Sequence, residues 1–210
     1  MSLPDSATAD TSINQRIARR VQALRSAQNL SLDALATRCG VSRSMISLIE
    51  RGESSPTAVV LERLASGLGV MLASLFDESP AMAEPVVRRA AQLSWTDPQS
   101  GYVRRNLSPP GYPSPLQLVE VSFPPGARVA YETGARERAV HQQVWVIAGS
   151  IAIQLGDEQH LLAAGDCLAM QLDRPMVYSN PHRQAARYIV AISHDHPVHN
   201  PVASPARRVA

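Results

Sequence analysis

Cysteine is scarce in this sequence, and lysine and long apolar runs are missing. The 210 residues contain two cysteines, Cys39 and Cys167, which are too few for a disulfide framework or a structural zinc site. No apolar run approaches the roughly 18 residues that a transmembrane helix needs. The stretch Met1–Asp10 has neither the basic residues nor the apolar core of a secretory signal. We therefore expect a cytoplasmic protein without a membrane partner.

Arginine supplies all the basic charge apart from histidine. The formal net charge of +2 is too small to indicate a nucleic-acid partner by itself, and the absence of lysine is most simply a bias of composition. The distribution of charge is more informative, because eight arginines between Ile13 and Val70 accompany only four acidic residues. Guanidinium groups hold phosphate in a two-point geometry. This segment is therefore the best candidate for a nucleic-acid contact.

The first third of the chain has the apolar spacing of helices. Ile13, Ile17, Val21 and Leu24 recur every three or four residues, which predicts an amphipathic helix. Three more helices are expected after residues that can act as N-caps, and a short turn follows. The expected ranges are Ser31–Gly40, Arg43–Arg51, Thr57–Gly67 and Leu72–Phe76. Together they predict a compact all-α domain over residues 13–76.

The pattern changes after a proline-containing linker at residues 77–87. Proline and glycine then separate short stretches that are β-branched or alternate between apolar and polar residues, which predicts at least seven strands in a sandwich or barrel. The clearest are Leu116–Phe123, Gln142–Ala148, Ile151–Leu155, His160–Ala163, Asp166–Leu172, Met176–Asn180 and Arg187–Ile192. We expect this all-β domain at residues 88–196 and a flexible tail at 197–210. The predicted fold class is α+β.

The second and third predicted helices have the spacing of a helix-turn-helix. Ala36 is small where two helices approach, and Gly40 suits the left-handed turn between them. The following helix presents a polar face with one long donor, Arg43, and such a helix enters the major groove of DNA. An arginine there can form two hydrogen bonds to guanine, while serines suit phosphate. The expected DNA-binding residues are Ser31, Ser42, Arg43, Ser44, Ser47 and Arg51.

The string SRSMISLIERGESSPT, residues 42–57, resembles the Xre/Cro-like family of bacterial repressors, and the resemblance extends over residues 13–76. It implies a double-stranded DNA operator as partner. It also implies a homodimer, because one helix-turn-helix reads only one half-site. In that family an arginine of the first helix pairs with the glutamate that ends the recognition helix. The matching residues are Arg25 and Glu50, which we expect to form a structural pair.

The string WVIAGSIAIQLG, residues 145–156, resembles the cupin family of small β-barrels, and the match covers residues 86–192. Most cupins hold a divalent metal with three histidines and a glutamate. The matching positions hold Arg136, Arg138, Gln142 and Met176. Arginine cannot act as a metal ligand, and the amide and thioether are poor ligands for hard metals. The resemblance therefore implies a barrel with no metal and no cofactor, which argues against catalysis.

Two interpretations of this barrel segment stay open. Arg136 and Arg138 alternate with Glu137, so both guanidiniums can face the barrel interior and bind an anionic small-molecule effector together with Gln142, Met176 and Tyr178. Alternatively, the segment is a solvated loop in which Glu132 and Glu137 pair the two arginines.

The expected function is a DNA-binding transcriptional regulator, most simply a repressor, whose metal-free cupin domain senses a small effector and supplies the dimer contact. One alternative is a metal-dependent cupin enzyme that carries a helix-turn-helix domain, such as an epoxidase or dioxygenase. Another is an antitoxin-like DNA-binding partner. The sequence contains no nucleophile-elbow motif that would support a hydrolase.

Overall fold

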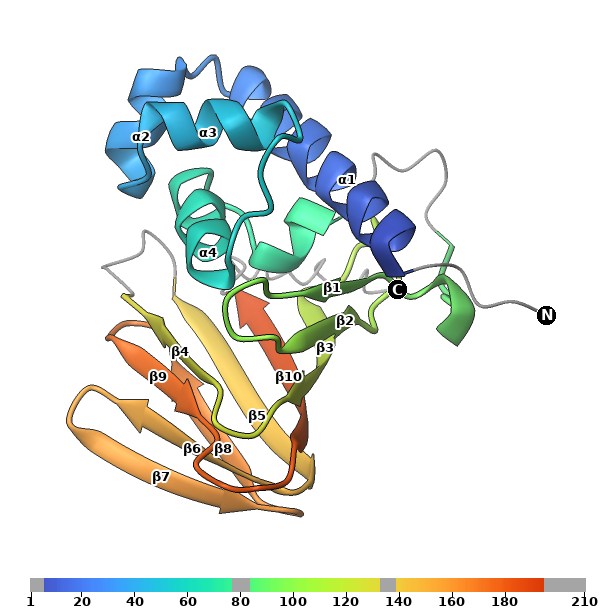
Figure 1. The fold of residues 1–210 in the computed structure, drawn as a ribbon, viewed down its shortest axis with the longest axis vertical. Helices are drawn as coiled ribbons and strands as arrows, with labels where there is room; N and C mark the ends of the chain where they lie inside the picture. The colour runs from blue at the N-terminus through green and yellow to red at the C-terminus, as the bar shows by residue number, and fades with distance from the viewer. Residues whose placement is uncertain (1–5, 77–83, 133–138, 195–210) are drawn as a thin grey trace, which may run out of the picture.

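The computed structural model places a layer of helices across one end of a two-sheet β-barrel (Figure 1). It describes residues 6–76, 84–132 and 139–194, with the side chains of residues 6–12 and of His194 excepted. The predicted α+β fold class is confirmed. No helix in this described part is long and apolar enough to cross a membrane.

The helical layer consists of four α-helices and a 3-10 turn. These are α1 (Ser6–Ala27), α2 (Leu32–Cys39), α3 (Arg43–Glu50), α4 (Ala58–Gly67) and η1 (Leu72–Phe76). The hydroxyls of Ser31, Ser42 and Thr57 accept hydrogen bonds from backbone amides in the first turns of α2, α3 and α4, so the three predicted N-caps are confirmed. Gly40 has φ +65°, the left-handed conformation expected between α2 and α3. The first helix is longer than predicted, because it begins in the polar stretch before Ile13 that carries no apolar stripe.

The β domain consists of two antiparallel sheets that face each other as a jelly roll. The larger has the order β1 (Ser94–Thr96), β2 (Val103–Asn106), β3 (Leu116–Phe123), β10 (Ala186–His194), β5 (Val140–Ala148), β8 (Cys167–Gln171). The smaller has the order β4 (Arg128–Tyr131), β9 (Met176–Ser179), β6 (Ser150–Leu155), β7 (Glu158–Ala163). This arrangement is the cupin type of barrel. A short 3-10 turn, η2 (Arg89–Ala91), precedes the first strand.

All seven predicted strands are present, and three further strands were not predicted. The unpredicted strands are β1, β2 and β4, each of three or four residues. Alternation is strongest in β5, where every second side chain from Val140 to Val146 is buried and the side chains between them are exposed. The buried side chains of both sheets fill the space between them.

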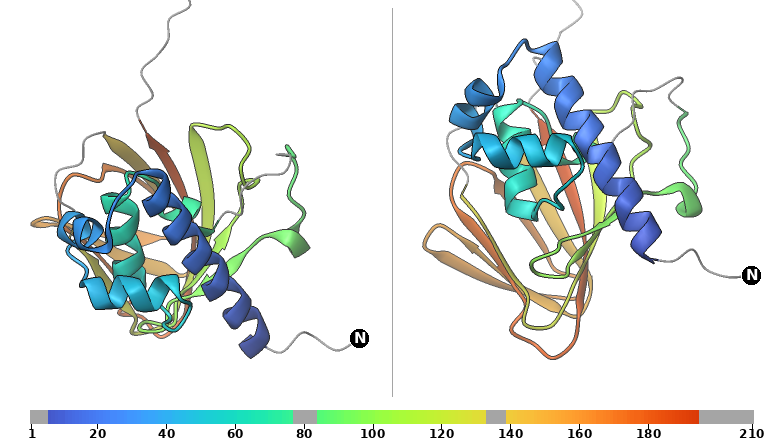
Figure 2. Two further views of the ribbon diagram at one scale, coloured as in Figure 1. Left: turned by 90° about the horizontal axis from the view of Figure 1, so that it is seen from above. Right: turned by 45° about the horizontal axis from the view of Figure 1, so that its top comes forward.

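The helical layer and the barrel share one continuous hydrophobic core, and Figure 2 shows the helices over the same end of the barrel in two further views. Phe76 at the end of η1 packs on Trp95 of β1 with ring centroids 5.9 Å apart, and Trp95 packs on Tyr102 at the same distance. The predicted linker, of which residues 77–83 lie outside the described part, therefore joins two domains that are packed together.

A buried carboxylate joins the two domains at the start of α4. Asp97, which is 2% exposed, follows β1, and its Oδ1 accepts a hydrogen bond of 2.9 Å from the backbone amide of Ala58. Its Oδ2 accepts a second bond of 2.9 Å from the amide of Ser100. Negative charge at a helix N-terminus also interacts favourably with the helix dipole. A residue of the barrel domain thus caps a helix of the DNA-binding domain.

We expect Asp97→Ala to lower the free energy of unfolding by about 1–3 kcal/mol, because it leaves the buried amide of Ala58 without an acceptor. Urea denaturation followed by circular dichroism measures this loss. Asp157→Ala, in the exposed turn between β6 and β7, is the matched control and should leave the free energy unchanged. Equal values for the two variants would contradict the role of Asp97 at the domain junction.

Candidate functional site: recognition helix and barrel cavity

Helix α3 presents a polar face to solvent and an apolar face to the core. Ile46 and Ile49 are buried, while Ser42, Arg43 and Ser44 at its start are exposed. The Arg43 side chain is 64% exposed and its Nε lies 3.4 Å from Oδ1 of Asp33, a loose contact on the surface. The N-terminal part of α3 is thus accessible to a nucleic acid, as direct base readout requires.

The other predicted DNA-binding residues are also on this side of the helix-turn-helix, but several already have partners. Ser31 caps α2, and Ser42 caps α3 and lies 3.2 Å from the hydroxyl of Ser44. Arg51 donates to the hydroxyl of Ser47 and forms a 2.7 Å ion pair with Glu53. Within this group, Arg43 therefore combines high exposure with the weakest intramolecular contact.

A nearly buried ion pair fixes the end of α3 to α1. Arg25 donates from Nε to Oε1 of Glu50 at 2.6 Å and from Nη2 to Oε2 at 2.7 Å, a two-point geometry. Its Nη1 also donates to the carbonyl oxygen of Leu30 at 2.8 Å. The hydrogen bond to Glu50 raises the pKa of Arg25. The structural pair expected from the family resemblance is confirmed, and it sets the direction of the recognition helix.

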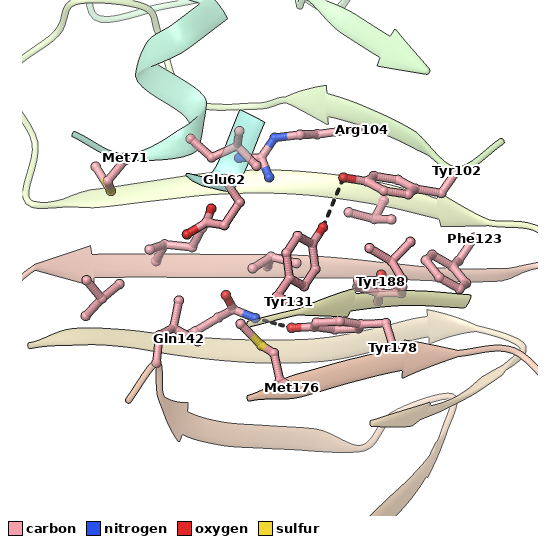
Figure 3. Close-up of a pocket in the computed structure, with 17 residues that line it drawn as sticks. Glu62, Met71, Tyr102, Arg104, Phe123, Tyr131, Gln142, Met176, Tyr178 and Tyr188 are labelled. Carbon is pink, nitrogen blue, oxygen red and sulfur yellow. Dashed lines mark hydrogen bonds between the residues drawn. The ribbon is translucent and has the colours of Figure 1, made fainter. Parts of the chain in front are cut away.

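A cavity lies inside the barrel at the end that the helical layer covers (Figure 3). Strands from both sheets line most of it, and the helical domain contributes Glu62 of α4 together with Met71 and Leu72 at η1. The space open to the centre of a water molecule is about 70 Å³. Since one water needs about 10–15 Å³ on this measure, the cavity has room for several waters or one small molecule.

The structure brings three of the five predicted effector residues together in this cavity. Gln142 of β5 and Met176 and Tyr178 of β9 all line it, and Nε2 of Gln142 donates a hydrogen bond to the hydroxyl of Tyr178. The other two, Arg136 and Arg138, lie outside the described residues. The acidic neighbour proposed for them at the loop surface, Glu132, forms an ion pair with Arg63 of α4.

Four tyrosines give the cavity neutral hydroxyl groups. The hydroxyls of Tyr102 and Tyr131 lie 3.3 Å apart, and the rings of Tyr178 and Tyr188 stack with centroids 6.1 Å apart. Burial raises the pKa of all four phenols. At neutral pH they remain protonated and can donate as well as accept hydrogen bonds.

Two charged residues of the cavity were missed by the sequence analysis. Arg104 of β2 is 7% exposed and Glu62 comes from the helical domain. Arg105, the next residue, points to the other face of the sheet and pairs with Glu120 at 2.6 Å. The alternation of a strand shows that one of two adjacent arginines faces inward, but β2 is too short and too polar for the sequence to show which.

The donor set that the described residues give the cavity does not fit a divalent metal. Gln142 offers only a neutral amide oxygen, and the thioether of Met176 is a weak ligand for hard ions. His141 is exposed on the opposite face of β5, so it cannot replace Gln142. Within the described residues, no group of three His, Cys, Asp or Glu side chains is placed to hold a metal ion.

Comparison with known proteins gives matches over the helical domain and over most of the chain. A family model described as a helix-turn-helix domain matches residues 16–77. The HTH-type transcriptional regulator SutR of Escherichia coli K12 is 30% identical over 165 residues, which are 79% of this chain and 87% of SutR. The regulator PuuR of the same strain is 27% identical over 175 residues, covering 82% of this chain and 92% of PuuR.

The similarity to a known regulator also includes the three-dimensional fold. The crystal structure of an HTH_3 family transcriptional regulator from Vibrio cholerae aligns with a TM-score of 0.74 and 25% identity. The alignment covers 89% of this chain and 99% of that one. The similarity therefore includes the barrel as well as the helices.

The ion pair at the end of α3 gives a direct test of its structural role. We expect Arg25→Ala to lower the free energy of unfolding by about 1.5–3 kcal/mol, because Glu50 keeps a nearly buried charge without its partner. Guanidinium denaturation measures this change. Arg51→Ala, which removes an exposed ion pair next to the same helix, should have little effect. A loss as large for Arg51→Ala as for Arg25→Ala would contradict this assignment.

Proposed function

Because the chain belongs to the Xre-like family of helix-turn-helix transcriptional regulators, we propose that it controls transcription by binding operator DNA in response to a small molecule held in its barrel. One observation carries the sensing part of this proposal. The wall of the cavity includes Glu62, Met71 and Leu72 of the DNA-binding domain. A ligand in the cavity therefore contacts both domains and can favour one arrangement of them over another, which is the thermodynamic requirement for coupling.

Base recognition is assigned to the start of α3. Its exposed end carries Arg43, whose guanidinium can form two hydrogen bonds to a guanine in the major groove. The exposed hydroxyls of Ser42 and Ser44, the backbone amides at the same end and the guanidinium of Arg51 suit phosphate oxygens. Ser31 and Ser47 flank this surface. The simplest outcome of such binding is repression by occupation of a promoter.

The outer face of the six-stranded sheet is proposed as the contact between two copies of the chain. Trp145 of β5 is 50% exposed there, directly opposite Ile189 of β10 and Cys167 of β8 in the strand register. A half-exposed tryptophan among apolar neighbours marks an interaction surface. A second copy is the occupant that the function requires, because two recognition helices are needed to read two half-sites.

We propose that the cavity senses a ligand and does not transform one. The residues at the positions of cupin metal ligands lack the donor chemistry of a Lewis-acid site, since Gln142 is a neutral amide and Met176 a thioether. SutR and PuuR, which match this chain over most of their length, are both named as transcriptional regulators. Their names support a regulator acting in the cytoplasm over an antitoxin or an enzyme.

The assignment of α3 is tested with DNA selected from a random duplex library by the purified protein. We expect Arg43→Ala to weaken binding to the selected duplex by about 1–3 kcal/mol and to relax the preference at one base pair. Fluorescence anisotropy at fixed salt measures the affinity. Arg128→Ala, which removes one exposed arginine from the barrel, is the matched control for net charge. Wild-type affinity of the Arg43 variant would disprove the base contact.

The dimer contact is tested by placing a charge on the outer face of the large sheet. We expect Trp145→Arg to convert a dimer into a monomer in sedimentation velocity, since the partner must then bury an unpaired guanidinium. Leu161→Arg changes a residue that is 64% exposed on β7 of the smaller sheet and should leave the dimer intact. An unchanged sedimentation coefficient for Trp145→Arg would place the interface elsewhere.

A further inference from the structure

Arg104 is a buried cation with unsatisfied N–H groups in the described part of the chain. It is 7% exposed and lines the cavity, and its Nε and Nη2 atoms have no hydrogen-bond acceptor within the described residues. Its guanidinium carbon lies 6.0 Å from the centroid of the Phe76 ring. Arg105 next to it has an ordinary ion pair with Glu120.

A buried guanidinium is normally surrounded by acceptors. It carries five N–H donors in a planar fork, and nearly all buried polar groups in proteins are paired. A contact with an aromatic ring offsets part of the charge but accepts no N–H in the plane of the fork. Figure 3 shows Arg104 at the side of the cavity that faces the helical domain, with Glu62 near it and Gln142, Met176 and Tyr178 on the opposite side.

We propose that Arg104 is the recognition residue for a small carboxylic acid that binds in the cavity as a monoanion. This inference rests on the proposed function and names the chemical class of its effector. A carboxylate matches the two-point geometry of the guanidinium fork. The protonated hydroxyl of Tyr102, whose pKa burial raises, lies in the same cavity and can donate to a ligand oxygen.

The walls and size of the cavity define the rest of the ligand. The barrel side chains that line it include several aliphatic residues, namely Val121, Val129, Val140, Leu172, Val190 and Ile192. They suit a short aliphatic or aromatic body. A dianion such as phosphate fits less well, because Arg104 is the only arginine among the lining residues of the described part and Glu62 carries a charge of the same sign as the ligand.

The position of Arg104 also connects the ligand to the DNA-binding domain. The ring under its guanidinium belongs to Phe76, the last residue of η1, and Phe76 in turn packs on Trp95. A carboxylate bound in the plane of the fork offsets the charge of the guanidinium and can shift it over this ring. The occupied and empty states therefore differ at a contact between the two domains, which is where a change in DNA affinity must originate.

The test uses three acids and their uncharged amides as probes: acetate, isovalerate and benzoate against acetamide, isovaleramide and benzamide. Isothermal titration calorimetry and the shift in melting temperature are measured on the full-length protein at constant ionic strength. We expect at least one acid to bind saturably and at least tenfold more tightly than its amide. Arg104→Met should abolish this difference, and Arg104→Lys should weaken acid binding at least tenfold because an ammonium lacks the fork.

Arg105→Met is the matched control, since it removes the neighbouring guanidinium on the other face of β2 and should leave acid binding unchanged. The proposal is overturned if no acid in the set binds more tightly than its amide, or if Arg104→Met binds the acid as the wild type does. Circular dichroism of each variant verifies the fold, and the chemically milder Arg104→Lys keeps the test valid if Arg104→Met fails to fold.

Binding of the selected duplex, measured on the same preparations, separates this inference from the proposed function. A wild-type protein that binds DNA but prefers no acid disproves the Arg104 assignment and leaves the DNA-binding proposal intact. An acid that binds through Arg104 without changing DNA affinity supports the assignment and disproves ligand sensing.

Discussion

The carboxylate of Asp97 sits at the junction on which the arrangement of this protein depends. It comes from the barrel, yet it caps α4 of the helical domain by accepting a hydrogen bond from the backbone amide of Ala58. Buried backbone amides must be paired, so the helix and the barrel cannot separate without exposing or breaking this bond. The aromatic packing of Phe76 on Trp95 strengthens the same junction. The recognition helix is therefore held in a defined orientation to the barrel.

This junction is the route by which the proposed ligand would influence DNA binding. The helical domain contributes part of the cavity wall, so ligand contacts and domain contacts share the same side chains. Arg104 shows this most clearly, because it faces the cavity and also stacks on the last residue of η1. In a dimer, a small rotation at this junction would change the separation of two recognition helices, to which half-site spacing on DNA is sensitive.

The helices were predictable from the sequence because their starts depend on local chemistry. Features that depend on contacts between distant residues were not predictable. Ser31, Ser42 and Thr57 marked three helix starts because a cap acts within one turn. Strands β1, β2 and β4 were missed, since each is only three or four residues long and none falls in a stretch of clear alternation. Gln142 and Met176 were found through the spacing of a known family. Arg104 was not, because the short strand β2 does not show which of its two adjacent arginines faces inward. The DNA contacts and the domain boundaries stay predictions.

The position of β10 has a consequence for how the protein is made. This strand, Ala186–His194, lies between β3 and β5 in the middle of the large sheet, although it is the last of the ten strands along the chain. Until it emerges from the ribosome, β3 and β5 have unpaired edges and the barrel cannot close. The helical domain can complete its local contacts much earlier. A nascent chain that stalls before residue 186 would thus carry finished helices and an aggregation-prone half-barrel, a natural substrate for chaperones.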